Sequence, residues 1–311
     1  MDLAILSGSS NVPLATAVAS RLGIPLGRRL IARSPDGEMQ VEIQENVRAC
    51  DVFLIQSTGP PIDRNLMELL FLTDACRRSG ANHVTAIIPY FGYSRQDRSA
   101  SGQQALGARL IADVLRTAGV GRIVAVDLHT ASIESAFGMA LEHLSAVGMF
   151  CDALPPLPSD SVLVAADMAA LKMTERYARV LRLPIAIVAK VRVSAEEVVA
   201  RSLIGDVQGR TPVIVDDIII TGGTIEAAVN AVVGAGAVPN ATVVATHGLF
   251  VGSAAKRLTA LPIARLLVTD SVEISSELKL PIEVISLAPT LAHVISRLHA
   301  GELLGELIAR I

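Results

Sequence analysis

Short apolar runs rich in valine and isoleucine alternate along the chain with stretches of helical periodicity. Short runs of this kind are typical of strands that are buried on both faces, and such strands form parallel sheets. We expect strands at residues 52–55, 84–88, 123–126, 161–165, 185–189, 213–215 and 242–245. The alternation with helices therefore predicts an α/β fold.

Apolar side chains in several of the intervening stretches recur at the 3.6-residue period of an α-helix. The sets are Leu66, Leu69, Leu70 and Thr73; Leu106, Leu110, Val114 and Leu115; and Ile225, Ala228, Val229 and Val232. We expect these stretches to form crossover helices that connect successive parallel strands.

A proline-rich segment, LPPLPSD at residues 154–160, interrupts this pattern. It can continue neither a helix nor a central strand, because proline lacks an amide proton and has a fixed φ angle. We therefore place a domain junction near residues 145–160. The predicted domains are residues 1–147 and residues 148–311.

The composition excludes several classes of protein. A net charge of −3 without a block of Lys or Arg argues against a nucleic acid partner. No uninterrupted apolar run approaches the roughly 18 residues of a membrane span. The N-terminus lacks the basic region of a signal peptide, so we expect a cytoplasmic protein with no membrane partner. Cys50, Cys76 and Cys151 are too few and too far apart for a disulfide framework or a cysteine metal cage.

The strongest local signal is VIVDDIIITGGT at residues 213–224. We expect an apolar strand that ends at two carboxylates and is followed by a turn that opens a helix. The glycines let backbone amides approach an anion, and the threonine hydroxyls add donors at the helix N-terminus. A monophosphate fits this turn, which consists of Thr221, Gly222, Gly223 and Thr224.

The two carboxylates before this turn belong to Asp216 and Asp217. They cannot bind phosphate themselves, but they can accept hydrogen bonds from vicinal sugar hydroxyls and hold Mg²⁺. Together with the turn they predict a ribose 5-phosphate site. The alternative is a plain strand-to-helix connection whose acids only cap and solvate it. The segment is neither a Walker loop nor a dinucleotide fingerprint.

Two further acidic positions follow predicted strands. Asp127 and His129 are two residues apart in VAVDLHT, so they point the same way if the chain is still extended there. The pair could hold a metal-nucleotide, although a structural role is the alternative. Asp167 follows the run VLVAAD, and its alternative role is a helix N-cap.

Lys190 and Arg192 follow the predicted strand 185–189 at alternate positions, so they project together if extended. Two cations beside a phosphate loop suit a transition state in which charge spreads over phosphoryl oxygens. The alternative is a solvated pair on an edge strand.

Two loops in the first half carry polar side chains. RSPDGE, residues 33–38, is a turn by composition. PYFGYSRQDRS, residues 89–99, places Arg95 and Gln96 close to three aromatic residues. Arginine pairs with phosphates and tyrosine can flank a base, so this loop could bind a nucleotide; the alternative is a surface loop that leads into a helix.

These segments together resemble one family over nearly the whole chain, the ribose-phosphate pyrophosphokinases, or phosphoribosyl pyrophosphate synthetases. The similar segments are SGSSNVPLA, DGEMQVEIQENVR, NLMELL, PYFGYSRQD, DLH, the K-x-R pair, IGDVQGRTPVIVDD, TGGT, ATHGLF, VTDSVEISSELK and ISLAP. The resemblance implies two tandem type I phosphoribosyltransferase-like domains. It also implies an Mg²⁺-dependent transfer of the β,γ-pyrophosphoryl group of ATP to the 1-hydroxyl of ribose 5-phosphate, with AMP released.

The resemblance further implies a role for each candidate residue. The ATP-binding residues would be Asp36, Gly37, Glu38, Arg95 and Gln96, and the metal-binding residues His129, Asp167 and Asp127. Lys190 and Arg192 would stabilise the transferring group. Asp216 and Asp217 would bind the ribose hydroxyls, and the turn Thr221–Thr224 the 5-phosphate. A homo-oligomer based on dimers, of which a hexamer is one form, is also implied.

Several positions depart from the family's pattern. Ser34 stands where an aromatic residue is common, Ile220 replaces an acid, and residues 99–107 lack the basic residues of a regulatory loop. These departures keep open a catalytically silent regulatory paralogue. A phosphoribosyltransferase is a further alternative, because it shares the loop from the paired acids to TGGT.

Overall fold

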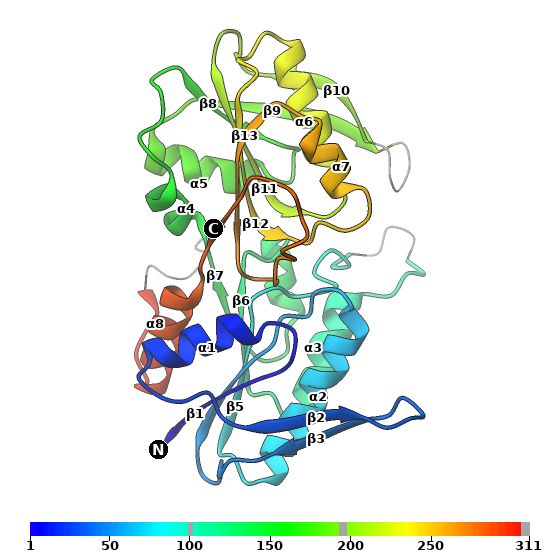
Figure 1. The fold of residues 1–311 in the computed structure, drawn as a ribbon, viewed down its shortest axis with the longest axis vertical. Coiled ribbons are helices and arrows are strands. Elements are labelled where there is room, and N and C mark those ends of the chain that lie inside the picture. Colours follow the sequence, from blue (N-terminus) through cyan, green and yellow to red (C-terminus); the bar gives the residue numbers. More distant parts are fainter. Residues whose placement is uncertain (99–101, 193–197, 306–311) are drawn as a thin grey trace. The chain divides into compact units, whose positions relative to one another are not determined.

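The computed structural model describes residues 1–98, 102–192 and 198–305, and only the backbone of residues 131, 132, 136, 190–192 and 198–201 within them. The chain forms two compact units, each with its own sheet (Figure 1). The first unit contains residues 1–145, 271–273 and those from 286 onward, and the second contains residues 146–270 and 274–285. The chain thus returns to the first unit after the second, which a single division at residue 147 does not describe.

Within the described residues, the first unit holds a five-stranded sheet in the order β1-β4-β5-β6-β7 (Figure 1). All neighbouring strands are parallel. The expected strands at 52–55, 84–88 and 123–126 are confirmed, whereas the outer two strands were not predicted. The bounds are β1 (Leu3–Ser7), β4 (Asp51–Ile55), β5 (His83–Ile88), β6 (Arg122–Val126) and β7 (Ala140–Leu144).

Helices α2 (Ile62–Arg78) and α3 (Gly107–Ala118) share one hydrophobic core with this sheet. Both helices were predicted, but the packing face of α3 differs from the expected one. Ala108, Ala112 and Leu115 are buried, while Leu110 is 56% exposed. The small side chains of Ala108 and Ala112 let α3 lie close to the sheet, and Leu110 points outward while Leu115 packs in the core. Helices α1 (Val12–Arg21) and α8 (Ala288–His299) pack against each other within the same unit.

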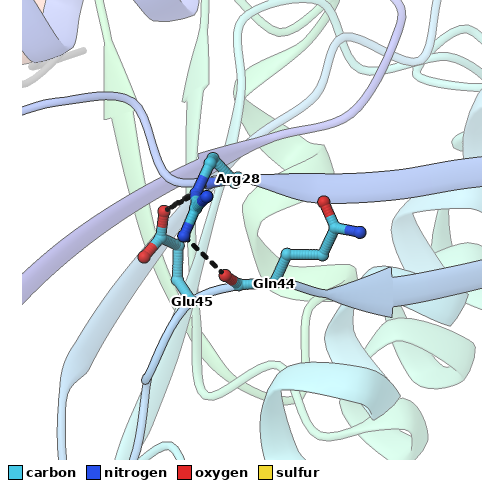
Figure 2. A network of polar contacts seen from close by, with 3 residues as sticks. All are labelled: Arg28, Gln44 and Glu45. Carbon is cyan, nitrogen blue, oxygen red and sulfur yellow. Dashed lines mark hydrogen bonds and ion pairs between the residues drawn. The ribbon is translucent and has the colours of Figure 1, made fainter.

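A separate antiparallel hairpin of β2 (Arg29–Arg33) and β3 (Met39–Ile43) belongs to the first unit (Figure 1). At its base, Arg28 donates to Glu45 Oε1 through Nε at 2.9 Å and through its backbone amide at 3.2 Å (Figure 2). The side-chain hydrogen bond from Arg28 lowers the pKa of Glu45. Arg28 Nη2 also lies 3.5 Å from the carbonyl oxygen of Gln44 (Figure 2). These contacts join the strands on the side away from the hairpin tip.

In the described part of the second unit, a seven-stranded sheet has the order β10-β9-β8-β11-β12-β13-β14. Only the pair of β10 and β9 is antiparallel among the described pairs. The expected strands at 161–165, 185–189, 213–215 and 242–245 are confirmed. The bounds are β8 (Ser161–Ala165), β9 (Ile185–Arg192), β10 (Val198–Ile204), β11 (Thr211–Ile219), β12 (Ala241–Gly248), β13 (Ile263–Thr269) and β14 (Ile282–Ile285).

Helices cover this second sheet. Helix α6 (Gly223–Gly234) buries the predicted face, including Ile225, Val229 and Val232, together with α7 (Ala254–Thr259). Helix α5 (Leu171–Leu181) packs on β8 and β11, and α4 (Val147–Ala153) packs on α5. Both units therefore have the predicted α/β architecture. Among the described residues, no helix combines the length and apolar composition that crossing a bilayer requires.

A buried carboxylate holds the loop that follows β1. Glu68 of α2 is fully buried and accepts hydrogen bonds from the backbone amide of Ser9 and, at 2.8 Å, from its hydroxyl. Gln56 Nε2 also donates to Glu68 Oε1 at 3.1 Å, and Gln56 Oε1 accepts from the Ser10 hydroxyl at 2.7 Å. A Cβ atom on Gly8 would lie 2.2 Å from Gln56 Oε1, so only glycine fits beside this network.

We predict that Glu68→Gln lowers the free energy of unfolding by about 1–3 kcal/mol, because an amide would turn a donor toward buried donors. Urea denaturation measures the change. The control is Glu42→Gln, because Glu42 is exposed on β3. Equal stability of the two variants would contradict the prediction.

Candidate functional site

The predicted turn at residues 33–38 is the tip of the hairpin of β2 and β3. The amide of Ser34 donates to the carbonyl of Glu38 at 2.9 Å, and the amide of Gly37 to the carbonyl of Ser34 at 2.8 Å. Gly37 has a φ angle of +93°, which favours glycine. Asp36, Gly37 and Glu38 are exposed. The tip is therefore an ordered turn that presents its polar groups to solvent.

Ser34, where the resembled family often has an aromatic residue, is bound within the hairpin. Its hydroxyl accepts a hydrogen bond from Gln40 Nε2 at 2.9 Å. The side chain is too small to cover a base, so this hairpin offers no stacking surface at that position.

The loop after β5 presents Arg95 and Gln96, both exposed. The amide of Gln96 donates to the carbonyl of Tyr93 at 2.8 Å, and the Gln96 carbonyl accepts from the amide of Ala108 at the start of α3 at 3.2 Å. A Cβ atom on Gly107 would lie 2.5 Å from Gln96 Oε1, so the glycine makes room for this side chain. The loop is thereby attached to the helix that follows it.

Asp97 connects this loop to the one after β6. The hydroxyl of Thr130 donates to Asp97 Oδ2 at 2.5 Å. Burial by itself would raise the pKa of Asp97. The net pKa is lowered, because the hydrogen bond from Thr130, a backbone hydrogen bond at Asp97 and the positive charges of Arg98 and His129 outweigh burial. Asp97 therefore stays ionised and binds Thr130, the residue that follows His129. Sequence reasoning assigned no such role to Asp97 or Thr130.

Strand β6 ends at Val126, so Asp127 and His129 are not extended as the prediction assumed. Asp127 is buried and has a φ angle of +36°, in the left-handed region. Its amide donates to the carbonyl of Leu144 at 2.9 Å. Strand β7 ends at Leu144, opposite Val126, and the carbonyl of Leu144 holds this first amide of the turn. His129 is half-buried in the turn that leads to the 3₁₀ helix η1 (Ala131–Ala136).

In the second unit, Asp216 and Asp217 lie within β11 and not after its end. The strand runs on to Ile219 because β12 continues to pair with it, with Ile218 opposite His247. The prediction of a strand end at Val215 was therefore wrong. Asp216 is buried, and its Oδ1 accepts the amide of Asp217 at 2.9 Å. Successive residues of a strand point to opposite faces, so the two carboxylates are offered in different directions.

The turn TGGT forms the N-terminus of α6, as predicted. Gly222 has a φ angle of +77°, and Gly223 is the first helical residue. Thr221 and Thr224 are half-buried. Near the start of α6, Glu226 pairs with Arg257 Nη1 of α7 at 2.8 Å, which offsets a negative charge that would repel an anion. The helix dipole and the first-turn amides make this turn favourable for a phosphate.

Asp167 follows β8 and binds its own turn. Its Oδ1 accepts the amides of Ala169 at 2.8 Å and Ala170 at 3.0 Å, just before α5. These contacts lie in the turn before the helix, whose N-cap residue is Ala170, so Asp167 does not form the helix N-cap that the sequence left open as an alternative. Asp167 is half-buried.

The backbone of Lys190 and Arg192 lies in β9, which extends to Arg192. Lys190 pairs with Ala200 and Arg192 with Val198 of β10, so β9 is not an edge strand. The side chains of these two residues lie outside the described part of the structure. Their predicted roles stay predictions.

Among the described residues, no three His, Cys, Asp or Glu side chains form a group that could hold a metal ion by themselves. Asp127 and His129 lie in the first unit and Asp167 in the second. Mg²⁺ commonly keeps several waters and takes one or two carboxylates together with substrate phosphates. Asp127 in the first unit, and Asp167, Asp216 and Asp217 in the second, are oxygen donors of this kind, so each unit by itself fits a substrate-bound Mg²⁺ better than a closed protein cage.

The sequence matches two domain families. Residues 3–119 match the N-terminal domain of ribose phosphate pyrophosphokinase, and residues 192–309 match the phosphoribosyl synthetase-associated domain. These two regions together span most of the chain, and they contain the hairpin tip, the loop after β5 and the TGGT turn.

Similar proteins agree with this match. A ribose-phosphate pyrophosphokinase of Caldanaerobacter subterraneus is 38% identical over 311 residues, which covers 98% of each chain. One of Staphylococcus saprophyticus is 37% identical over 305 residues and covers 96% of this chain and 95% of the relative. The crystal structure of phosphoribosylpyrophosphate synthetase from Mycobacterium smegmatis superposes with a TM-score of 0.90 at 34% identity, covering 97% of this chain and 100% of that one.

The fold defines an α/β protein of two phosphoribosyltransferase-like domains. The chain belongs to the ribose-phosphate pyrophosphokinase family, so it is an enzyme of the class that transfers diphosphate groups.

Two residues for which the sequence predicted no role lie beside the Asp-Leu-His turn. His143 of β7 and Glu134 of η1 are hydrogen-bonded to each other at 2.8 Å, and His143 also accepts the amide of Leu128 at 2.8 Å. No local motif marks them, because only the register of β6 with β7 brings His143 to this place.

We predict that Gly222→Ala destabilises the protein by about 1–2 kcal/mol, because alanine is strained at a left-handed φ angle. Thermal unfolding measures the change. Gly234→Ala is the matched control at the other end of α6, where a Cβ atom meets nothing within 4 Å. There alanine should be neutral or stabilising by up to about 1 kcal/mol. Equal effects of the two variants would refute the requirement for glycine at 222.

Proposed function

We propose that the protein transfers the β,γ-pyrophosphoryl group of ATP to the 1-hydroxyl of ribose 5-phosphate, with Mg²⁺, and releases AMP. The products are then 5-phosphoribosyl 1-pyrophosphate and AMP. Family membership supports the reaction class. The observation that carries the substrate assignment is the TGGT turn at the start of α6, which directly follows a strand with two acids.

In this proposal the second unit binds ribose 5-phosphate. The 5-phosphate lies against the first-turn amides of α6 and the hydroxyls of Thr221 and Thr224, where Arg257 offsets the negative charge of Glu226. Asp216 and Asp217 accept hydrogen bonds from the ribose hydroxyls. Ile220, half-buried between them and the turn, cannot accept one. We therefore expect the two acids to carry the whole recognition of the sugar hydroxyls by carboxylates in this loop.

The first unit supplies the nucleotide-binding groups. Arg95 and Gln96 present a cation and an amide to the nucleotide, and the hairpin tip adds Asp36, the amide of Gly37 and Glu38. Arginine suits the triphosphate because its planar guanidinium donates to two phosphate oxygens at once. With Ser34 in place of an aromatic side chain, we expect base recognition to rest on hydrogen bonds more than on stacking.

The chemical step forms one bond and breaks one. The 1-hydroxyl oxygen of the sugar attacks the β-phosphorus of ATP, the bond from that phosphorus to the oxygen shared with the α-phosphate breaks, and AMP leaves with that oxygen. The hydroxyl proton passes to solvent or to a neighbouring base. Lys190 and Arg192 act on the oxygens of the transferring group, where negative charge accumulates in the transition state.

Mg²⁺ would neutralise the phosphate oxygens of ATP when bound. Asp127, His129 and Asp167 are the protein groups proposed to orient it, together with the waters of its hydration shell. The two carboxylates are the groups here that suit this hard cation best, and His129 would act through a bound water or on a phosphate oxygen.

Phosphorus NMR of the purified protein with ATP, ribose 5-phosphate and Mg²⁺ tests the proposed reaction. We expect AMP and an anomeric pyrophosphate to appear together in equal amounts. Binding of ribose 5-phosphate without any turnover at high enzyme concentration would instead identify a silent paralogue, the possibility raised by Ser34 and Ile220. Formation of a product only when a nucleobase and an activated ribose are supplied would identify a phosphoribosyltransferase.

We predict that Lys190→Ala lowers kcat roughly 10²- to 10³-fold and changes the affinity for ribose 5-phosphate little, because its charge acts in the transition state. Steady-state kinetics and calorimetry with ribose 5-phosphate measure the two quantities. Lys172→Ala on α5, an exposed lysine of the same unit, is the control and should leave both unchanged. Equal losses of turnover and affinity would show that Lys190 serves binding alone.

A further inference from the structure

The turn after β6 is held from one side by the end of β7. Two consecutive amides of the turn donate to two consecutive residues of that strand. The amide of Asp127 donates to the carbonyl of Leu144 at 2.9 Å, and the amide of Leu128 donates to Nε2 of His143 at 2.8 Å. One of these two acceptors is a side chain, so the geometry of the turn depends on the state of an imidazole ring.

The hydrogen bonds determine which nitrogen of His143 carries the proton. A backbone amide can only donate, so Nε2 must be the unprotonated, accepting nitrogen. The proton of the neutral ring is then on Nδ1, which lies 2.8 Å from Glu134 Oε1 and donates to it. His143 is buried, whereas the Glu134 side chain is 40% exposed. A carboxylate on Nδ1 is a common way for proteins to select a histidine tautomer.

The turn needs this support because its backbone is strained. Asp127 has a φ angle of +36°, in the left-handed region that a residue with a Cβ atom rarely adopts. Such a conformation persists only where the surroundings hold it in place. If the proton of His143 moved to Nε2, two donors would face each other at Leu128, and one of the two restraints on the turn would be lost.

We propose that Glu134 and His143 are positioning residues for the Asp127–His129 turn. Glu134 selects the tautomer of His143, His143 holds the amide of Leu128, and this fixes the directions of Asp127 and His129. The catalytic consequence rests on the proposed function, in which these two residues orient the metal-nucleotide. The register that pairs Ala125 of β6 with His143 of β7 places the ring at the end of the strand that leads into the turn.

Another glutamate of the same strand region offers a matched control. Glu142 precedes His143 on β7 and pairs with Arg122, so it lies on the opposite side of the strand and does not contact Leu128. Glu134→Leu removes the acceptor for Nδ1, Glu134→Gln keeps a neutral oxygen acceptor there, and Glu142→Leu removes a carboxylate of the same strand region without touching the ring.

The tautomer is read first, without any turnover, by nitrogen-15 NMR of histidine-labelled protein. In the unsubstituted protein and in Glu134→Gln we expect His143 to have a protonated Nδ1 and an unprotonated Nε2. In Glu134→Leu we expect a mixture of tautomers and faster hydrogen exchange of the Leu128 amide. An unchanged tautomer and unchanged exchange in Glu134→Leu would overturn the proposal.

Activity is read second. Glu134→Leu should lower kcat/KM for ATP roughly 10- to 100-fold, the usual cost of losing a partner behind a functional group. Glu134→Gln should retain most of the activity, and Glu142→Leu should match the unsubstituted protein. A changed tautomer with unchanged kcat/KM would refute the catalytic part. If the unsubstituted protein shows no turnover, the proposed function fails, and the NMR and exchange results alone decide whether the pair positions the turn.

Discussion

The pairing of buried strands in parallel is the constraint on which the rest of this structure depends. A parallel sheet aligns the carboxyl ends of its strands along one edge, and the chain must leave each strand there before a helix returns it. In the first unit the loops after β1, β4, β5 and β6 therefore begin at the same edge. In the second unit the same holds for the loops after β8, β11 and β12. Within each unit, candidate residues from distant parts of the sequence lie at one edge because parallel backbone hydrogen bonding aligns the carboxyl ends of the strands there.

Buried polar groups hold these loops. Glu68 accepts hydrogen bonds from the loop after β1. The hydrogen bond from Thr130 to Asp97 joins the loops after β5 and β6, and His143 accepts the amide of Leu128 in the turn after β6. A buried polar group without a partner costs free energy, so each of these contacts restricts its loop to one conformation. The hydrophobic core decides that the units fold, and these hydrogen bonds decide how the functional groups are presented.

The departures from the family's pattern fall at places that the fold tolerates. Ser34 is accommodated by a hydrogen bond from Gln40 within the hairpin, and Ile220 lies in the connection between β11 and α6 without disturbing the start of the helix. Neither of these side chains sets the path of the chain, because the backbone pairing of the strands does.

The sequence by itself determined the α/β class, seven strands of the two sheets, the presence of three helices with clear periodicity, the turn at residues 33–38 and the TGGT turn that opens α6. Periodicity and turn chemistry are local properties. It also identified the family, since the motifs recur in order. Tertiary structure alone decided the continuation of β11 through Asp216 and Asp217, the outward face of α3 and the return of α8 to the first unit. It also decided the left-handed turn at Asp127 and the contact of Glu134 and His143 with it. Each of these depends on which strand or helix lies alongside, and partners distant in sequence leave no local pattern.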